Sequence, residues 1–154
     1  MDSLVRNSAS INEMLTRYGV KFGLYKNGSF HEQIFPFDPI ARTIEADEWK
    51  ELSAGLAQRV RALNAFLQDI YGQKRIITDG VIPPEFVFSS PGFLKACDGV
   101  MPPEGVYTHI SGIDLVQARD KSWYVLEDNL RIPSGASYPL IAREICRRAS
   151  PQTF

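Results

Sequence analysis

Residues 105–135, GVYTHISGIDLVQARDKSWYVLEDNLRIPSG, contain the pattern that most constrains how this chain can fold. Two runs, Tyr107–Gln117 and Trp123–Leu130, are rich in the β-branched, aromatic and long apolar residues that favour strands. The polar tetrapeptide Arg119-Asp120-Lys121-Ser122 separates them. Because a short polar segment between two such runs is typical of a hairpin, the sequence predicts two antiparallel strands joined by a four-residue turn.

A four-residue turn fixes which residues lie opposite each other in this hairpin. The resulting cross-strand pairs are Ala118–Trp123, Val116–Val125, Asp114–Glu127 and Gly112–Asn129. Asp114, Glu127 and Asn129 therefore share one face. Two carboxylates directly opposite each other lie about 5 Å apart and repel, unless a cation lies between them. Their oxygen ligands suit Mg²⁺ or Mn²⁺, since Mg²⁺ commonly takes one or two carboxylates and completes its shell with phosphate oxygens and waters.

Arg131 extends this constellation beyond the three oxygen ligands. It follows Asn129 by two residues, so it has the same strand parity, and its planar guanidinium matches phosphate geometry. The pattern predicts a magnesium–phosphate site. Two other interpretations stay open: acidic residues at strand ends are commonly solvated, and a slip of one residue would pair Asp114 with Leu126 or Asp128 instead.

Periodicity and turn residues predict the other elements. Alternating apolar residues around Asn27-Gly28 indicate a first hairpin. Apolar residues spaced by three and four predict a long helix over Glu45–Tyr71, with Arg59 on its solvated side. Shorter expected elements are a helix that opens at Ser10 after disordered residues 1–9, a strand over Lys74–Thr78, a helix over Pro91–Cys97 and a helix after the N-cap Ser137.

We expect one domain, 1–154, of α/β class with α+β character, in which a mixed or mainly antiparallel sheet of hairpins is covered by the long helix.

Composition argues against several classes of function. Seventeen basic and eighteen acidic residues give a net charge of −1, without the basic face that nucleic-acid binding requires. No apolar run approaches the roughly 18 residues of a membrane span, and no secretory leader pattern is present. Cys97 and Cys146 fit no metal or redox spacing. We therefore expect a cytoplasmic protein that binds neither nucleic acid nor membrane.

Four segments, in this order, resemble one known family. They are FPFDPIAR (Phe35–Arg42), QRVRALNAFLQDIYG (Gln58–Gly72), GVYTHISGIDL and WYVLEDNLRIPSGASY. From about Tyr18 to Tyr138 the chain resembles the circularly permuted ATP-grasp family, type 2, which is related to glutathionylspermidine-synthase-like proteins. The resemblance implies an ATP-dependent ligase that joins a carboxylate to an amine. It also implies Asp114, Glu127 and Asn129 as the magnesium ligands, the same residues that strand pairing selects.

The resemblance implies roles for the residues that follow the second strand. Arg131 would neutralise charge on the transferred phosphoryl group, and the loop of Ser134, Gly135 and Ser137 would position phosphate or substrate. Where the family tends to continue Leu-Glu-Asn-Arg, this chain has Leu-Ile-Ala-Arg at 140–143. The permutation would also place the adenine pocket, the phosphate-binding lysines and the lid in a downstream part, and no Walker-type loop replaces them.

These departures lead to one expectation and two alternatives. We expect the N-terminal, metal- and phosphate-binding portion of an ATP-dependent ligase, incomplete alone and either truncated or completed by a second chain or domain. One alternative is a non-catalytic binding or scaffold module that retains the fold without the nucleotide-binding half. The other is self-association through apolar surface intended for the missing part.

Overall fold

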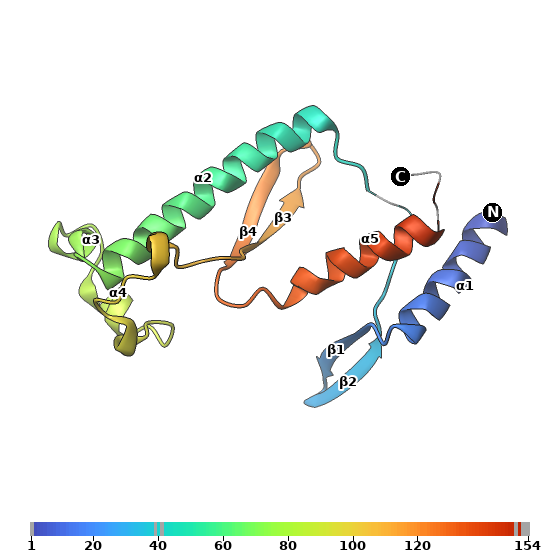
Figure 1. The fold of residues 1–154 in the computed structure, drawn as a ribbon, viewed down its shortest axis with the longest axis horizontal. Coiled ribbons are helices and arrows are strands. Elements are labelled where there is room, and N and C mark those ends of the chain that lie inside the picture. Colours follow the sequence, from blue (N-terminus) through green and yellow to red (C-terminus); the bar gives the residue numbers. More distant parts are fainter. Residues whose placement is uncertain (1, 39, 41, 150, 152–154) are drawn as a thin grey trace. The chain divides into compact units, whose positions relative to one another are not determined.

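The computed structural model describes residues 2–38, 40, 42–149 and 151, with side chains for 8–38, 40, 42–133, 135–149 and 151. Within these residues five α-helices and four strands form a mixed α/β structure, as predicted (Figure 1). The strands form two separate antiparallel hairpins instead of one common sheet. No helix in the described part is both long and apolar enough to span a membrane.

The chain divides into two compact units. The first comprises Met1–Thr43 and Ser134–Phe154, and the second comprises Ile44–Pro133. Organisation of residues 1–154 as a single domain stays a prediction.

The first unit packs two helices together and carries the first hairpin. Its elements are α1 (Asp2–Arg17), β1 (Lys21–Lys26), β2 (Ser29–Ile34), the 3-10 turn η3 (Ser134–Ala136) and α5 (Ser137–Ala149). Ile11 and Leu15 of α1 are buried against Ile145 of α5. Ser10 therefore lies inside α1 instead of capping it, and residues 2–9 are helical. No Gly or Pro interrupts 2–17, and packing around Ile11 favours a helix longer than the capping pattern predicted.

The hairpin β1–β2 is regular and has the predicted turn. Its register is uniform from Lys21 opposite Ile34 to Lys26 opposite Ser29. Asn27 and Gly28, the two turn residues, both have positive φ, 51° and 77°. Two consecutive positive φ angles are typical of the type I′ turn, whose twist matches that of the strands.

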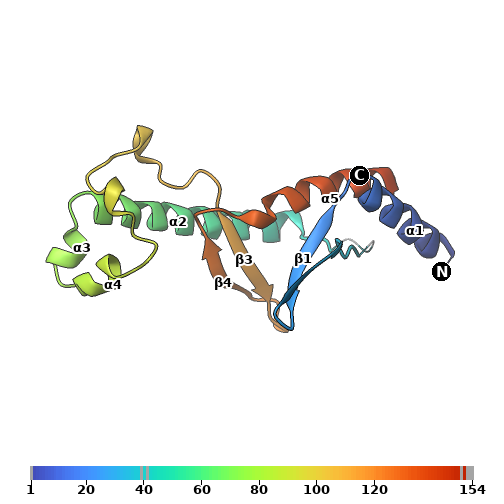
Figure 2. The same ribbon diagram turned by 90° about the horizontal axis from the view of Figure 1, so that it is seen from below.

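The second unit is built along the long helix. Its elements are α2 (Ala46–Tyr71), α3 (Arg75–Thr78), α4 (Pro84–Phe88), the 3-10 turns η1 (Lys95–Cys97) and η2 (Pro103–Gly105), β3 (Gly112–Gln117) and β4 (Trp123–Asn129). The helix predicted over Glu45–Tyr71 is confirmed, and its last residues, Ile70 and Tyr71, are buried with Val87 of α4. Figures 1 and 2 show β3 and β4 beside α2, with α3 and α4 near its C-terminal end.

Two of the shorter predicted elements differ in the structure. The strand predicted over Lys74–Thr78 from Ile76 and Ile77 is wrong, since α3 is helical. The Asp69 carboxylate explains this, because its oxygens accept hydrogen bonds from the amides of Arg75 and Ile76, both at 2.9 Å. A side chain that satisfies the free amides at a helix start favours the helix. The helix expected over Pro91–Cys97 is only the 3-10 turn η1.

Candidate functional site

One face of the hairpin β3–β4 lies against α2, and the other is exposed. Glu48 of α2 defines the inner face, because its Oε1 accepts hydrogen bonds from Gln117 Nε2 and Trp123 Nε1, both at 2.8 Å. Leu115 and Val125, two residues from these donors, line a hollow of about 530 Å³ with residues of α2. The inner face thus contains alternate residues of each strand, as a half-buried hairpin requires.

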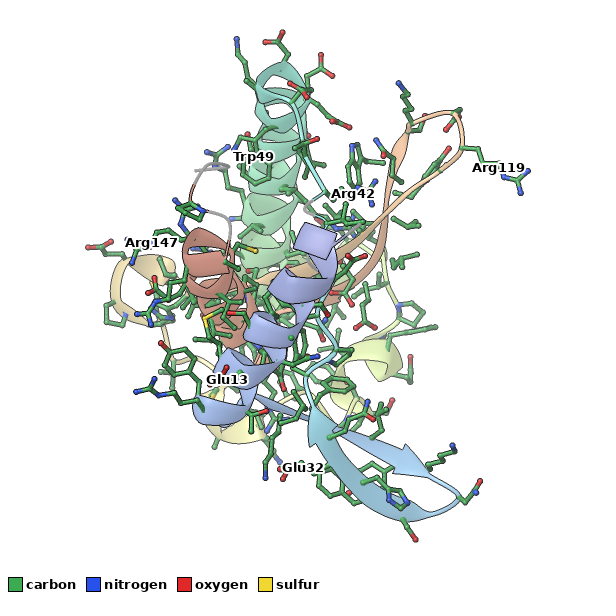
Figure 3. All side chains as sticks on the ribbon, turned by 90° about the vertical axis from the view of Figure 1, so that its right-hand side faces the viewer. Glu13, Glu32, Arg42, Trp49, Arg119 and Arg147 are labelled. Carbon is green, nitrogen blue, oxygen red and sulfur yellow. The ribbon has the colours of Figure 1, made fainter. Side chains whose placement is uncertain are left out.

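The turn of this hairpin is shorter than predicted. The Ala118 amide donates to the Ser122 carbonyl at 2.9 Å, so the turn contains three residues, 119–121, instead of four. Lys121 closes it with a left-handed backbone, φ 69°, and Arg119 projects from its tip (Figure 3). Beside the turn, Gln117 therefore lies opposite Trp123. The predicted pairs Ala118–Trp123 and Val116–Val125 are wrong, since both are displaced by one residue.

A β-bulge compensates for the shorter turn. Leu115 lies opposite Val125, but the next pair is Asp114 opposite Glu127, so Leu126 is the extra residue. The predicted pairs Asp114–Glu127 and Gly112–Asn129 are thereby confirmed. An extra residue on one strand locally disrupts the ladder and changes the direction of the side chains beyond it. Asp114 and Glu127 consequently share the outer, solvent-exposed face.

Asn129 contacts Glu127 from the same face. Its Nδ2 donates to Glu127 Oε1 at 2.9 Å. Because this bond uses the amide nitrogen of Asn129, it does not involve the amide oxygen, the atom that could bind a metal. It does occupy one carboxylate oxygen of Glu127. Within the described part of the chain, no group of three His, Cys, Asp or Glu side chains is placed to hold a metal. Two carboxylates and an amide oxygen fit Mg²⁺ only where phosphate oxygens or waters supply the remaining ligands.

Gly112, opposite Asn129, allows the backbone to approach closely here. A β-carbon at Gly112 would lie 2.8 Å from Pro133 Cβ and 3.5 Å from Asn129 Cβ. A β-carbon essentially never lies as close as 2.8 Å to another heavy atom. The glycine therefore lets the segment after β4 pass directly beside β3.

Asp128, between Glu127 and Asn129, points to the other face and binds α2. Arg59 donates two hydrogen bonds to it, from Nε to Oδ1 at 2.8 Å and from Nη2 to Oδ2 at 2.6 Å. These hydrogen bonds lower the pKa of Asp128 below its usual value and raise the pKa of Arg59. The side chain of Asp128 is only 15% exposed. Arg59 is exposed, as predicted, and its guanidinium also reaches Asp128.

The remaining predicted site residues follow the end of β4. Arg131 is exposed two residues beyond Asn129. Gly135 lies in η3, and Ser137 is the first residue of α5, while the side chain of Ser134 is outside the described residues. These three residues belong to the first unit, and Asp114 belongs to the second. Their roles, and that of Arg131, stay predictions.

Comparison with known proteins places this hairpin in a family. The family described as "circularly permuted ATP-grasp type 2" matches residues 41–154, which include α2, both strands of the site and α5. The chain belongs to this family. The resemblance predicted from four sequence segments is therefore confirmed, as is the expectation of a partial ATP-grasp-like α/β fold.

Several relatives of this ATP-grasp chain are much longer. An uncharacterized protein, sll0335, of Synechocystis sp. (strain ATCC 27184 / PCC 6803 / Kazusa) is 49% identical over 140 residues, covering 91% of this chain and 29% of the relative. The protein named "Putative glutamate--cysteine ligase 2-3" of Frankia alni (strain DSM 45986 / CECT 9034 / ACN14a) is 41% identical over 137 residues, 89% of this chain and 16% of the relative. An uncharacterized protein, ML0605, of Mycobacterium leprae (strain TN) is 42% identical over 142 residues, 92% and 25% respectively. The chain thus spans less than a third of each relative.

Proposed function

We propose that this chain is the metal- and phosphate-binding portion of an ATP-dependent carboxylate–amine ligase. ATP-grasp proteins generally use ATP and Mg²⁺, and the chain belongs to that family. The observation that carries the proposal is the register of β3–β4, which sets Asp114 opposite Glu127 with Asn129 bonded to Glu127. Such an arrangement of like charges is unfavourable without a cation and suits one with oxygen ligands.

Asp114, Glu127 and Asn129 would hold the ion through their oxygens. A bound Mg²⁺ would neutralise phosphate oxygens and orient them. Arg131, exposed just beyond β4, would donate to the transferred phosphoryl group, because a guanidinium is always charged and can bind two phosphate oxygens at once. The backbone amides of the Ser134–Ser137 segment, which ends at the first residue of α5, would bind phosphate or the substrate carboxylate.

Names of relatives support the class of substrate. Two of them, from Frankia alni and Frankia casuarinae (strain DSM 45818 / CECT 9043 / HFP020203 / CcI3), are named as glutamate–cysteine ligases. A ligase of two amino acids joins a carboxylate to an amine, which fits the proposed reaction. The same reaction would require ATP, the two substrates and the remaining part of the active site, supplied by a further domain or chain.

Titration of the chain with Mn²⁺, with and without ATP, tests the proposal. We expect saturable binding that ATP strengthens, since phosphate oxygens would complete the coordination shell. Glu127→Ala should lower the affinity at least about tenfold, because even indirect partners of metal ligands contribute about that much. Glu13→Ala, an exposed acid on α1, is the matched control and should leave the affinity unchanged (Figure 3).

Indifference of Mn²⁺ binding to Glu127→Ala would contradict the proposal. That result would favour the alternative of a non-catalytic binding or scaffold module. Equal losses in Glu127→Ala and Glu13→Ala would also contradict it, because they would indicate a general effect of negative charge and not a site.

A further inference from the structure

A one-residue slip defines an alternative to the register of β3–β4 near the acidic pair. Without the bulge at Leu126, the pairing beside the turn would continue unchanged, and Asp114 would lie opposite Leu126. Strand side chains alternate strictly, so Glu127 would then share the face of Val125, which is directed at α2. Glu127 would leave the outer face, and Asp114 would lose its partner there.

Arg59 can in principle bind the acid of either register. In the observed register, Asp128 faces α2 and accepts two bonds from Arg59. In the competing register, Glu127 would occupy the position nearest Arg59 instead. The carboxylates of Glu127 and Asp128 would thus compete for the guanidinium of Arg59. Only the pairing of Arg59 with Asp128 leaves Glu127 on the outer face beside Asp114.

We propose that Arg59 and Asp128 are positioning residues that select the bulged register and keep Glu127 on the outer face, where the cation would bind. The assignment of a cation to Glu127 rests on the proposed function, but the selection of the register does not. Leu130 supports the selection, since it is partly buried in the observed register and has the parity of Asp128. The competing register would move it to the exposed face.

The proposal predicts an unusual pattern in a double-mutant cycle. Asp128→Asn removes the charge that holds Arg59, so Arg59 should draw Glu127 inward and the Mn²⁺ affinity should fall about tenfold. Adding Arg59→Ala to Asp128→Asn removes the guanidinium that draws Glu127 inward. Most of the Mn²⁺ affinity should therefore return. Arg59→Lys keeps the positive charge but cannot reproduce the two-bond fork, so it should retain only part of the affinity. Arg61→Ala, exposed on the same helix, is the control.

Nuclear Overhauser contacts between backbone protons report the register directly, without any metal. We expect Gly112 to contact residue 129 in the unchanged protein and residue 128 in Asp128→Asn, with the first contact restored in the double variant. If the pair only stabilised the fold, Asp128→Asn would weaken the hairpin without moving the contact to residue 128, and the double variant would show no recovery. Either that result or an unchanged register in Asp128→Asn would overturn the proposal.

The two readouts separate this inference from the proposed function. If the unchanged protein binds no Mn²⁺ but the register shifts as predicted, the proposed function fails and the role of Arg59 and Asp128 stands. If Mn²⁺ binding depends on Glu127 but Asp128→Asn binds Mn²⁺ as tightly as the unchanged protein, the proposed function stands and this inference fails.

Discussion

The two hairpins of this chain have the same strand order but obtain their registers in different ways. In β1–β2 a two-residue turn with Asn27 and Gly28 sets one uniform register, and most of its residues are exposed. In β3–β4 a three-residue turn sets one register beside the turn, and a bulge changes it before the acidic pair. The bonds to Glu48 and Arg59 of α2 hold this second hairpin at both ends.

The difference shows where a hairpin can carry a site. Where the turn alone sets the register, the turn also decides which side chains lie opposite each other. A register that also depends on contacts with a helix can place two like charges opposite each other, which a free hairpin would avoid. Substitutions in the two hairpins, and in the units that carry them, test this contrast.

Gly112→Ala should have the largest effect. Its β-carbon would lie 2.8 Å from Pro133 Cβ, so we expect the free energy of unfolding, measured by urea denaturation, to fall by about 1–3 kcal/mol. Gly23→Ala is the counterpart in β1–β2, where the new β-carbon would meet the ring of Phe30. Phe30 is 58% exposed, so its ring can rotate away. Equal or greater destabilisation by Gly23→Ala would contradict the contrast between the hairpins.

Gly28→Ala tests whether the turn alone sets the first hairpin. Gly28 has φ 77°, and no atom lies within 4 Å of the place that an added β-carbon would occupy, so we expect strain and not a clash. A left-handed non-glycine residue costs about 1–2 kcal/mol, and the free energy of unfolding should fall by that amount. A loss of register in the amide spectrum of β1–β2 should accompany it, and an intact register would show that the turn is not decisive.

Lys121→Gly should have a smaller effect of opposite sign. Lys121 has φ 69° in the turn of β3–β4, where glycine is unstrained. We expect the midpoint of thermal unfolding to rise, corresponding to a gain of up to about 1 kcal/mol. Lys121→Ala keeps the strain and should give no gain, so a similar rise in both variants would assign the effect to the lost charge.

Glu144→Gln should have the smallest effect and concerns the unit that contains β1–β2. Hydrogen bonds from Arg148, and then from Arg147, lower the pKa of Glu144 in the folded state. A carboxyl with a lowered pKa stabilises the fold at neutral pH, and this contribution is lost as the pH falls through the range below its usual 4.5. The variant should therefore lose less stability between about pH 7 and pH 3 than the unchanged protein. An identical pH dependence of unfolding would contradict this assignment.

The sequence predicted the elements whose signals are local and strong. The long helix follows from its apolar periodicity, and the first hairpin follows from Asn27-Gly28. Asp69 shows the limit, because its bonds to α3 override the strand preference of Ile76 and Ile77. No propensity scale includes such a contact.

The acidic pair was predicted correctly because two errors compensate. The turn is one residue shorter than expected, and the bulge at Leu126 adds one residue back before Glu127. Val125, Leu126 and Glu127 give no local sign of a bulge, since the apolar residues suit a regular strand equally well. The contact that accompanies it, between Arg59 and Asp128, joins residues 69 positions apart and has no local signal. Metal binding at this pair stays a prediction.

The two anchors on α2 also constrain insertions and deletions. Glu48 and Arg59 are about three helical turns apart, so they project from nearly the same side with a rise of about 16 Å between them. A single residue inserted between them would rotate Arg59 by about 100° relative to Glu48 and separate it from Asp128. Between these positions the number of residues in α2 is therefore as strictly constrained as the identity of either anchor.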